Sequence, residues 1–280
     1  MNNNISSSSS PEKTIVFSHA NGFPAGCYRV LFDIWQAAGW QVHALPRLGH
    51  DPAFPVSSNW PKLRDQLIHF IEVEVKPSGP VTLIGHSLGG LLSLLVACKR
   101  PDLTAGVVML DAPVISGWKA QSVRAVKHMR LISKLGPGKI SRRRRHEWPD
   151  RAAVLTHFAA KHKFARWDPR VLQAYVDCGF EEHADGKTHL TFTREVETRI
   201  YNTLPHHLDS LLKRHPPRCP VGFIGGTQSD ELRAAGMAAT KALAGQQMAW
   251  LEGSHLFPFE RPDETAAQVL QLQERLLASL

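Results

Sequence analysis

Hydrophobic positions in the first 110 residues fall into two patterns. Short apolar runs rich in β-branched residues are bounded by Gly, Pro or Asn and predict buried strands, whereas longer segments with apolar residues at helical spacing predict helices. The expected strands are residues 13–18, 40–45, 80–84 and 105–110, and the expected helices are 28–38, 60–75 and 88–100. This alternation indicates a parallel sheet with helices on both faces, because parallel neighbours need a crossover that covers the sheet.

The alternation stops between residues 112 and 217. This stretch carries helical fragments at 149–163 and 169–176 and a possible hairpin around Asp185-Gly186. We expect it to be a mainly helical insertion that lies over the sheet as a lid. The α/β pattern then resumes, with expected strands at 220–226 and 247–251 and expected helices at 231–243 and 262–277.

Composition fits this picture. The chain has 280 residues, 43% hydrophobic and 21% charged, as in an ordinary globular protein and unlike collagen, coiled coils or disordered chains. Residues 1–12, mostly Asn and Ser, predict a disordered leader, because they bury too little apolar surface to offset their ordering entropy. Residues 13–280 are expected to form one domain. No window approaches the roughly 18 apolar residues of a membrane span, so we expect no membrane association.

Charge and cysteine content give weaker information. The formal net charge is +8, and the densest basic cluster is Arg142 to Arg145. A run of four is short for a nucleic-acid surface, so we interpret it as a solvated loop, with attraction for an anionic substrate tail and nucleic-acid binding as alternatives. The four cysteines form no CxxC pair or zinc-ligand group. We expect free thiols in a reducing cytoplasm, and no metal or cofactor.

The motif that carries chemistry is Gly85-His86-Ser87-Leu88-Gly89, which fits G-x-S-x-G between an expected strand and an expected helix. A serine on so sharp a turn has a strained backbone, and side chains two positions before and after it would collide, so both positions are glycine. Ser87 then projects above the sheet at the start of a helix, where the helix dipole favours an anion. This context predicts a nucleophile, which needs a base to activate it.

With this motif, the chain resembles the α/β-hydrolase family from about residue 13 to its end. The resemblance implies a triad in the order serine, acid, histidine, and places the base at His255, after the last expected strand. The family's acid commonly lies three positions beyond a glycine, where this chain has Ser229 after Gly226. We therefore expect the next residue, Asp230, to be the acid. Asp111, which follows the strand at 105–110, is the alternative.

The resemblance also implies an oxyanion hole of backbone N–H groups. One donor should be Leu88, directly after the nucleophile. The other should come from residues 18–24, which resemble the family's His-Gly segment with Ala20 in place of the glycine. This leaves the register open between Ala20, Asn21 and Gly22, and alignment on His19-Ala20 favours Asn21. His19 itself is expected to organise the loop through hydrogen bonds.

Several other residues have expected roles. We expect His86 to pack inside the turn, and Arg47 to His50 to form a structural turn. Five aromatic residues of the insertion could either wall an acyl pocket or attach the insertion to the sheet, and we favour attachment. These are Trp118, Trp148, Phe158, Phe164 and Trp167.

The sequence therefore predicts a serine hydrolase of carboxylic esters, thioesters or related acyl bonds that acts on a small-molecule substrate. The alternatives are a C–C bond hydrolase, or a ligand-binding or signalling member of the fold without hydrolytic activity. Dehalogenases and epoxide hydrolases are disfavoured because their nucleophile is an aspartate, whereas position 87 is a serine. No nucleic-acid partner is expected.

Overall fold

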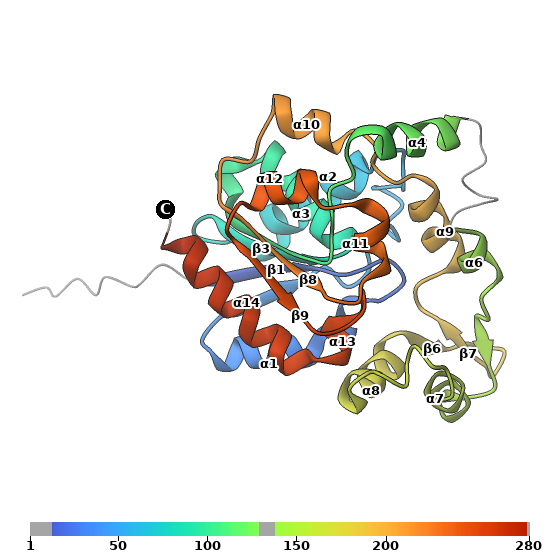
Figure 1. The fold of residues 1–280 in the computed structure, drawn as a ribbon. Coiled ribbons are helices and arrows are strands. Elements are labelled where there is room, and N and C mark those ends of the chain that lie inside the picture. Colours follow the sequence, from blue (N-terminus) through green and yellow to red (C-terminus); the bar gives the residue numbers. More distant parts are fainter. Residues whose placement is uncertain (1–12, 129–137, 279–280) are drawn as a thin grey trace, which may run out of the picture.

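The computed structural model describes residues 13–128 and 138–278, and the expected leader at 1–12 lies outside them. The main feature is a six-stranded sheet in the order β2-β1-β3-β4-β8-β9, in which every neighbouring pair is parallel (Figure 1). Its strands are β1 (Thr14–Ser18), β2 (Gln41–Ala44), β3 (Val81–His86), β4 (Thr104–Leu110), β8 (Val221–Gly226) and β9 (Met248–Leu251). The predicted α/β fold with a parallel sheet is confirmed.

Successive residues of the inner strands β1, β3, β4 and β8 pack into two separate cores on opposite faces of the sheet, which explains their near-continuous apolar sequences. In β1, Ile15 and Phe17 belong to one core and Val16 to the other. The Val16 core also contains residues of α2 (Pro61–His69), α3 (Leu88–Lys99), α11 (Asp230–Ala235) and α12 (Ala238–Ala244). The opposite core contains residues of α1 (Arg29–Ala37) and α14 (Pro262–Leu277). Helices thus cover both faces, as predicted.

Two expected helices differ in detail. The helix expected over 60–75 changes from α2 to a π-helical turn, η2 (Phe70–Val75). The helix expected over 231–243 is two short helices, because Gly236 between α11 and α12 has φ +81°, which an α-helix cannot accommodate. Three short helices complete this part of the chain: η1 (Ala25–Tyr28), η3 (Pro101–Leu103) and α13 (Phe257–Glu260).

The segment between β4 and β8 lies largely to one side of the main sheet in Figure 1. It includes the insertion predicted at 112–217, of which residues 129–137 are outside the described part. Its elements are α4 (Gly117–His128), α6 (Gly138–Arg143), β5 (Glu147–Trp148), α7 (Arg151–Ala159), α8 (Pro169–Cys178), β6 (Phe180–Glu182), β7 (Thr188–Leu190), α9 (Arg194–Asn202) and α10 (Leu208–Arg214). Strands β6 and β7 form the predicted hairpin, and β5, which was not predicted, extends it to a three-stranded antiparallel sheet.

Aromatic packing attaches the insertion to the sheet domain. Trp148, Phe158 and Trp167 are buried in the same core as α1 and α14, and Phe164 packs against it. Trp118 differs, because 72% of its surface is exposed. The attachment role is supported directly for Trp167, whose ring packs against Phe23 and Phe259 with centroids 5.7 and 4.6 Å apart, whereas the ring contacts of Trp148, Phe158 and Phe164 are with other rings of the insertion. None of the helices within the described residues is both long and apolar enough to span a bilayer.

Candidate active site

Ser87 lies at the carboxyl end of β3, immediately before α3. Its φ of 53° and ψ of −113° lie far from the preferred regions for a residue with a side chain. The conformation is held by hydrogen bonds on both sides of the turn: the Ser87 N–H donates to the carbonyl of Leu110 at 2.9 Å, and its own carbonyl accepts from Leu91 N–H at 3.2 Å. A serine with a strained backbone between a strand and a helix is the arrangement that the sequence motif predicts.

Close packing around the turn explains its glycines. A Cβ on Gly85 would overlap the backbone of Gly89, and a Cβ on Gly89 would overlap the carbonyl of Ser18 in β1. The predicted steric reason for both glycines is confirmed. It also shows that the start of α3 is pressed directly against the end of β1.

His255 follows β9 and pairs with Asp111, which follows β4. The His255 Nδ1–H donates to Asp111 Oδ1 at 2.9 Å. Asp111 is fully buried, and its carboxylate accepts two further hydrogen bonds, from Ser229 Oγ at 2.7 Å and from Gly226 N–H at 2.8 Å. With Nδ1 engaged, the other ring nitrogen of His255, Nε2, is the one that remains for a substrate-side proton transfer.

The expectation that Asp230 is the partner of the histidine is not supported. The Asp230 side chain is 86% exposed and pairs with Arg233 on the surface of α11. The reason lies one residue earlier. Ser229 caps α11, accepting a hydrogen bond from Leu232 N–H while its hydroxyl donates to Asp111. The position where the family commonly has its acid thus holds a serine that binds the carboxylate supplied by β4.

His86 connects the serine turn to the histidine loop. Its Nε2–H donates to the carbonyl of His255 at 2.8 Å, and its Nδ1 accepts from the Tyr28 hydroxyl at 2.7 Å. The same hydroxyl accepts from the N–H of Ala20 at 3.2 Å. Burial, and the nearby His255, keep the pKa of His86 well below its usual value, so the ring is neutral. The expected packing role of His86 therefore includes a hydrogen-bonded bridge.

The loop after β1 is held by His19 and by the insertion. The His19 Nδ1–H donates to the Ala20 carbonyl and its Nε2 accepts from Leu48 N–H, both at 2.8 Å. Burial lowers the pKa of His19 to about 4, so it is a neutral loop organiser, as predicted. The Ala20 N–H is engaged by Tyr28, which leaves Asn21 and Gly22 as candidate oxyanion donors. Leu88 N–H lies in the first turn of α3, where N–H groups have no intrahelical acceptor.

Comparison with known proteins identifies the family. Residues 15–268 match the model of the alpha/beta hydrolase family.

The chain belongs to the α/β-hydrolase family.

The individual proteins that resemble this chain have low sequence identity to it. The chain is 30% identical to mouse (Mus musculus) monoglyceride lipase over 131 residues, which cover 45% of this chain and 43% of the lipase, so the match spans less than half the length of that relative. Among solved structures, E-2-(acetamidomethylene)succinate hydrolase superposes with a TM-score of 0.72 at 20% identity, covering 95% of this chain and 92% of that one. The thioesterase domain of the curacin biosynthetic pathway gives 0.67 at 17% identity, with 92% and 91% covered.

In this α/β-hydrolase, α9 of the insertion contacts the loop that follows β1. The Asn21 side-chain amide donates to the carbonyl of Glu197 at 3.1 Å, and a Cβ on Gly22 would lie 3.0 Å from the Glu197 carboxylate. Arg144 binds that carboxylate at 2.8 Å and the Tyr175 hydroxyl at 2.9 Å. Glu197, which the sequence analysis did not single out, therefore holds the candidate oxyanion loop from the insertion side.

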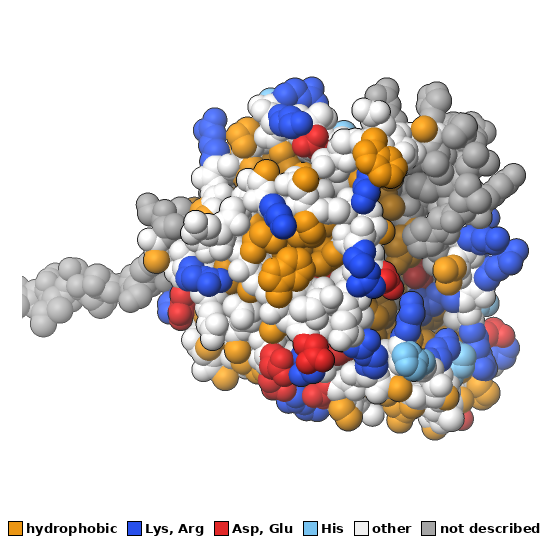
Figure 2. All heavy atoms as spheres, in the orientation of Figure 1, with side chains coloured by type: hydrophobic (Ala, Val, Ile, Leu, Met, Phe, Trp, Pro, Cys, Tyr) orange, Lys and Arg blue, Asp and Glu red, His pale blue; other side chains and the backbone are white. Residues whose placement is uncertain are grey.

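This pairing divides the predicted basic cluster. Arg142, Arg143 and Arg145 are exposed, whereas Arg144 turns inward to Glu197. On the face shown in Figure 2, Lys and Arg side chains gather most densely over the insertion, at the right. The four arginines are thus not one continuous binding stripe, and a solvated surface accounts for the three exposed side chains.

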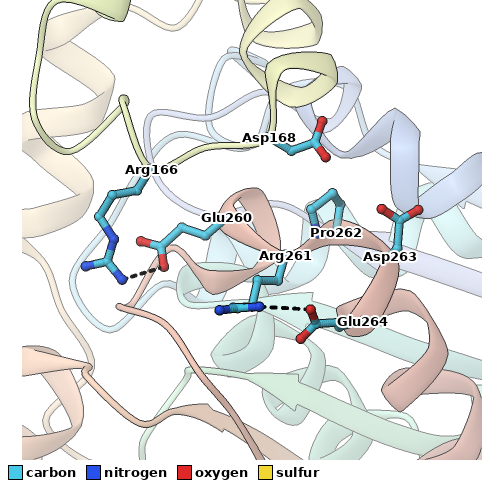
Figure 3. Close-up of a pocket in the computed structure, with 7 residues that line it drawn as sticks. All are labelled: Arg166, Asp168, Glu260, Arg261, Pro262, Asp263 and Glu264. Atoms are coloured by element: carbon cyan, nitrogen blue, oxygen red, sulfur yellow. Dashed lines mark hydrogen bonds and ion pairs between the residues drawn. The ribbon is translucent and has the colours of Figure 1, made fainter.

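A charged surface hollow lies where the insertion meets the start of α14 (Figure 3). Arg166 pairs with Glu260 at 3.1 Å and Arg261 with Glu264 at 2.9 Å, while the other two lining carboxylates, Asp168 and Asp263, both pair with Arg170. Glu260 also faces inward, where it accepts from the N–H of Ser254 at 3.1 Å and from its hydroxyl at 2.6 Å. Ser254 precedes His255. Glu260, at the wall of the hollow, thus stabilises the loop that carries His255.

One group of candidate metal ligands occurs among the described residues. Glu147, Asp185 and His189 lie within reach of a common ion on the small antiparallel sheet of the insertion. Glu147 is already paired with Lys187 at 2.9 Å, and Asp185 with His189 at 2.9 Å. These partners account for the grouping without a metal.

Proposed function

We propose that this chain is a serine hydrolase of acyl bonds in which Ser87 is the nucleophile, His255 the base and Asp111 the acid. The observation that carries the proposal is the hydrogen bond from His255 Nδ1 to the fully buried Asp111, at the carboxyl edge of the sheet where the strained Ser87 also lies. Ligands of open α/β sheets bind at this edge. Asp111 replaces Asp230 as the proposed acid.

The proposed reaction proceeds through an acyl-enzyme. The Ser87 hydroxyl attacks the carbonyl carbon while His255 Nε2 accepts its proton. Asp111 keeps the His255 ring in the tautomer that leaves Nε2 free to accept, and stabilises the imidazolium that forms. The proton then passes to the leaving alcohol or thiol. Water, activated by the same nitrogen, releases the acid and restores Ser87.

The developing oxyanion needs donors that are already in place. We propose the N–H groups of Leu88 and Asn21. Leu88 begins α3, so its N–H also lies at the positive end of a helix dipole. Asn21 is buried, and its side chain is held by the Glu197 carbonyl, which fixes the loop before substrate arrives.

The proposed substrate is a small carboxylic ester, and a fatty-acid monoester of glycerol is the first to test, because the chain is similar to mouse monoglyceride lipase. We further propose that the insertion at 112–217 acts as a lid that determines the acyl group accepted. Support comes from its contacts with both catalytic loops, through Glu197 on Asn21 and through Arg166 on Glu260.

A fluorophosphonate probe tests the proposal without knowledge of the substrate, because it reacts with an activated serine. We expect the wild-type protein to be labelled and Ser87→Ala to be unlabelled. Ser210→Ala, which changes an exposed serine of α10, is the matched control and should be labelled normally. The wild type and Ser210→Ala should hydrolyse p-nitrophenyl esters and monoacylglycerols, and Ser87→Ala should not. A folded wild-type protein that neither reacts with the probe nor cleaves esters would support a ligand-binding role instead.

A further inference from the structure

Two cysteines from distant parts of the chain meet where the insertion contacts the sheet domain. Cys27 lies in η1, just after the loop that follows β1, and Cys178 is the last residue of α8. They are 151 positions apart, yet their sulfur atoms are 3.3 Å apart and share a hydrogen bond. A disulfide needs a separation of about 2.05 Å, so a small side-chain adjustment would allow a bond.

The surroundings hold these two segments together. A Cβ on Gly26 would lie 2.8 Å from the Cβ of Cys178, so glycine is what allows η1 and α8 to approach so closely. Next to the sulfur pair, Arg29 and Asp177 form an ion pair at 2.9 Å across the same interface. The thiols are therefore placed by backbone packing and by a flanking charge pair.

The two thiols have different access and different acidity. Cys27 is fully buried, whereas Cys178 lines an open surface groove together with Pro24 and Gly26. The hydrogen bond from Cys27 and the charge of Arg29 lower the pKa of Cys178, while burial raises the pKa of Cys27. An accessible thiol with a lowered pKa is the one that attacks first in thiol–disulfide exchange.

The remaining cysteines give an internal comparison. Cys98 and Cys219 are also half-buried, but burial raises the pKa of Cys98 to about 12 and that of Cys219 to about 11. Neither is therefore suited to make the first attack on an external disulfide, which is the step assigned to Cys178.

We propose that Cys27 and Cys178 are a redox-reactive pair that forms a reversible disulfide by exchange with a low-molecular-weight disulfide such as oxidised glutathione. The Cys178 thiolate attacks one sulfur of glutathione disulfide, forming a mixed disulfide and releasing one glutathione thiolate, which takes up a proton. The Cys27 sulfur then attacks the Cys178 sulfur and loses its proton, and the second glutathione leaves as a thiol. The protein pair loses two electrons, and the glutathione disulfide gains them.

The bond would fasten α8 of the insertion to the segment that carries Tyr28, whose hydroxyl binds Ala20 N–H in the candidate oxyanion loop. A fastened insertion would change the turnover of bulky esters, and this consequence rests on the proposed function. Formation of the disulfide does not rest on the proposed function, because it is detected as a change in peptide mass.

The experiment is to equilibrate the whole purified chain in glutathione buffers of increasing oxidised fraction, block the remaining thiols, and map the peptides without reduction. In the wild type we expect two of the four thiols to be lost, a peptide linking Cys27 to Cys178, and full reversal by a dithiol reductant. In Cys27→Ser, glutathione should stay attached to Cys178, because no second thiol can displace it. The double variant Cys98→Ser/Cys219→Ser is the matched control and should still form the bond.

Four free thiols at every buffer ratio would overturn the proposal. So would stable glutathione on Cys178 of the wild type, or a bond between Cys98 and Cys219. If a serine variant does not fold, the wild-type peptide map still decides the question. If the protein shows no esterase activity, the map is unaffected, so the two proposals fail separately.

Discussion

Asp111 shows how one residue can be fixed by elements that are far apart in sequence. Its φ is +44°, an unfavourable value for a residue with a side chain, and it is fully buried. A buried carboxylate is tolerated only when it is paired and hydrogen-bonded. Donors from Ser229, Gly226 and His255 meet that need, so strain and burial at this position are both compensated by the site it serves.

Replacing Asp111 by Asn should therefore lower kcat for ester hydrolysis by about 10³- to 10⁴-fold, the effect expected when the histidine loses its orienting carboxylate. Asp230→Asn is the control: its side chain is exposed, and we expect activity within a factor of about two and stability within about 0.5 kcal/mol of the wild type. Steady-state kinetics of both variants checks this. Equal losses in the two variants would contradict the assignment.

Site residues could be predicted from the sequence where the residues that position them are contiguous in the chain. Ser87 could be placed because its strand, turn and helix are contiguous, and His255 because it follows the last strand. The sequence indicates Asp230 as the acid with Asp111 as the alternative, whereas His255 pairs with Asp111; both aspartates follow strands that are neighbours in the sheet, so position after a strand does not separate them. A serine at the offset of the usual acid was the available cue, since its hydroxyl can bind a carboxylate supplied from elsewhere. The residue roles themselves remain proposals.

At the scale of elements, the position of each candidate group depends on how closely strands and helices approach. Helix α3 meets β1 at Gly89, and α13 supports the loop after β9 through Glu260. The sequence predicted most of these elements but not the short α13 or the break at Gly236. The helix break follows from the φ of +81° at Gly236, and α13 has only four residues, so neither feature is visible in hydrophobic periodicity.

Gly89→Ala should severely destabilise the protein. The added methyl group would overlap the carbonyl of Ser18, and relief would need movement of a buried strand or of α3, so we expect a loss of about 3 kcal/mol or more. Gly79→Ala is the control, because nothing lies near its Cβ position and its φ is not in the left-handed region. Urea denaturation of both variants measures the difference. An unchanged midpoint for Gly89→Ala would show that the turn is less tightly packed than described.

Glu260→Gln should lower kcat with little change in global stability. The carboxylate accepts from both the N–H and the hydroxyl of Ser254, and a glutamine has only one acceptor for these two donors. The loop that carries His255 should then lose its fixed position, with a loss of about 10- to 100-fold. Glu264→Gln, on the exposed part of the same charged hollow, should be neutral. Parallel kinetics and thermal unfolding separate a positioning effect from a loss of fold.

At the scale of the whole molecule, buried neutral histidines link stability to pH. His19 has a pKa of about 4 in the folded chain, against 6.5 for an ordinary histidine. Below pH 6.5 the unfolded chain binds a proton that the folded chain does not, so the stability that His19 supports is complete above that pH and falls as the pH drops towards 4. The pKa of His86 is lowered in the same direction.

The free energy of unfolding should therefore fall between pH 7 and pH 5, by about 2 kcal/mol from His19 alone. His19→Gln keeps one donor and one acceptor but cannot titrate, so its stability should be lower at pH 7 and fall less steeply. Urea unfolding of both proteins at the two pH values gives the slopes. Identical slopes would mean that folding does not shift the pKa of His19, because the folded and unfolded chains would then take up protons equally.

The parallel pairing of β4 with β8 also constrains how this molecule can diversify. Leu110, at the exit of β4, is opposite Ile224, while β8 is entered at Val221, opposite Val107. The chain therefore leaves β4 at the carboxyl ends of the strands and must return to their amino ends to enter β8, a distance of roughly 10 Å along the strands. The segment that contains α10 leads into β8 and completes the crossover connection that the parallel pairing requires. The part before α10 can be exchanged only if the contact of Glu197 with Asn21 and the core shared with α1 and α14 are kept, so new specificities would have to arise from residues outside those contacts.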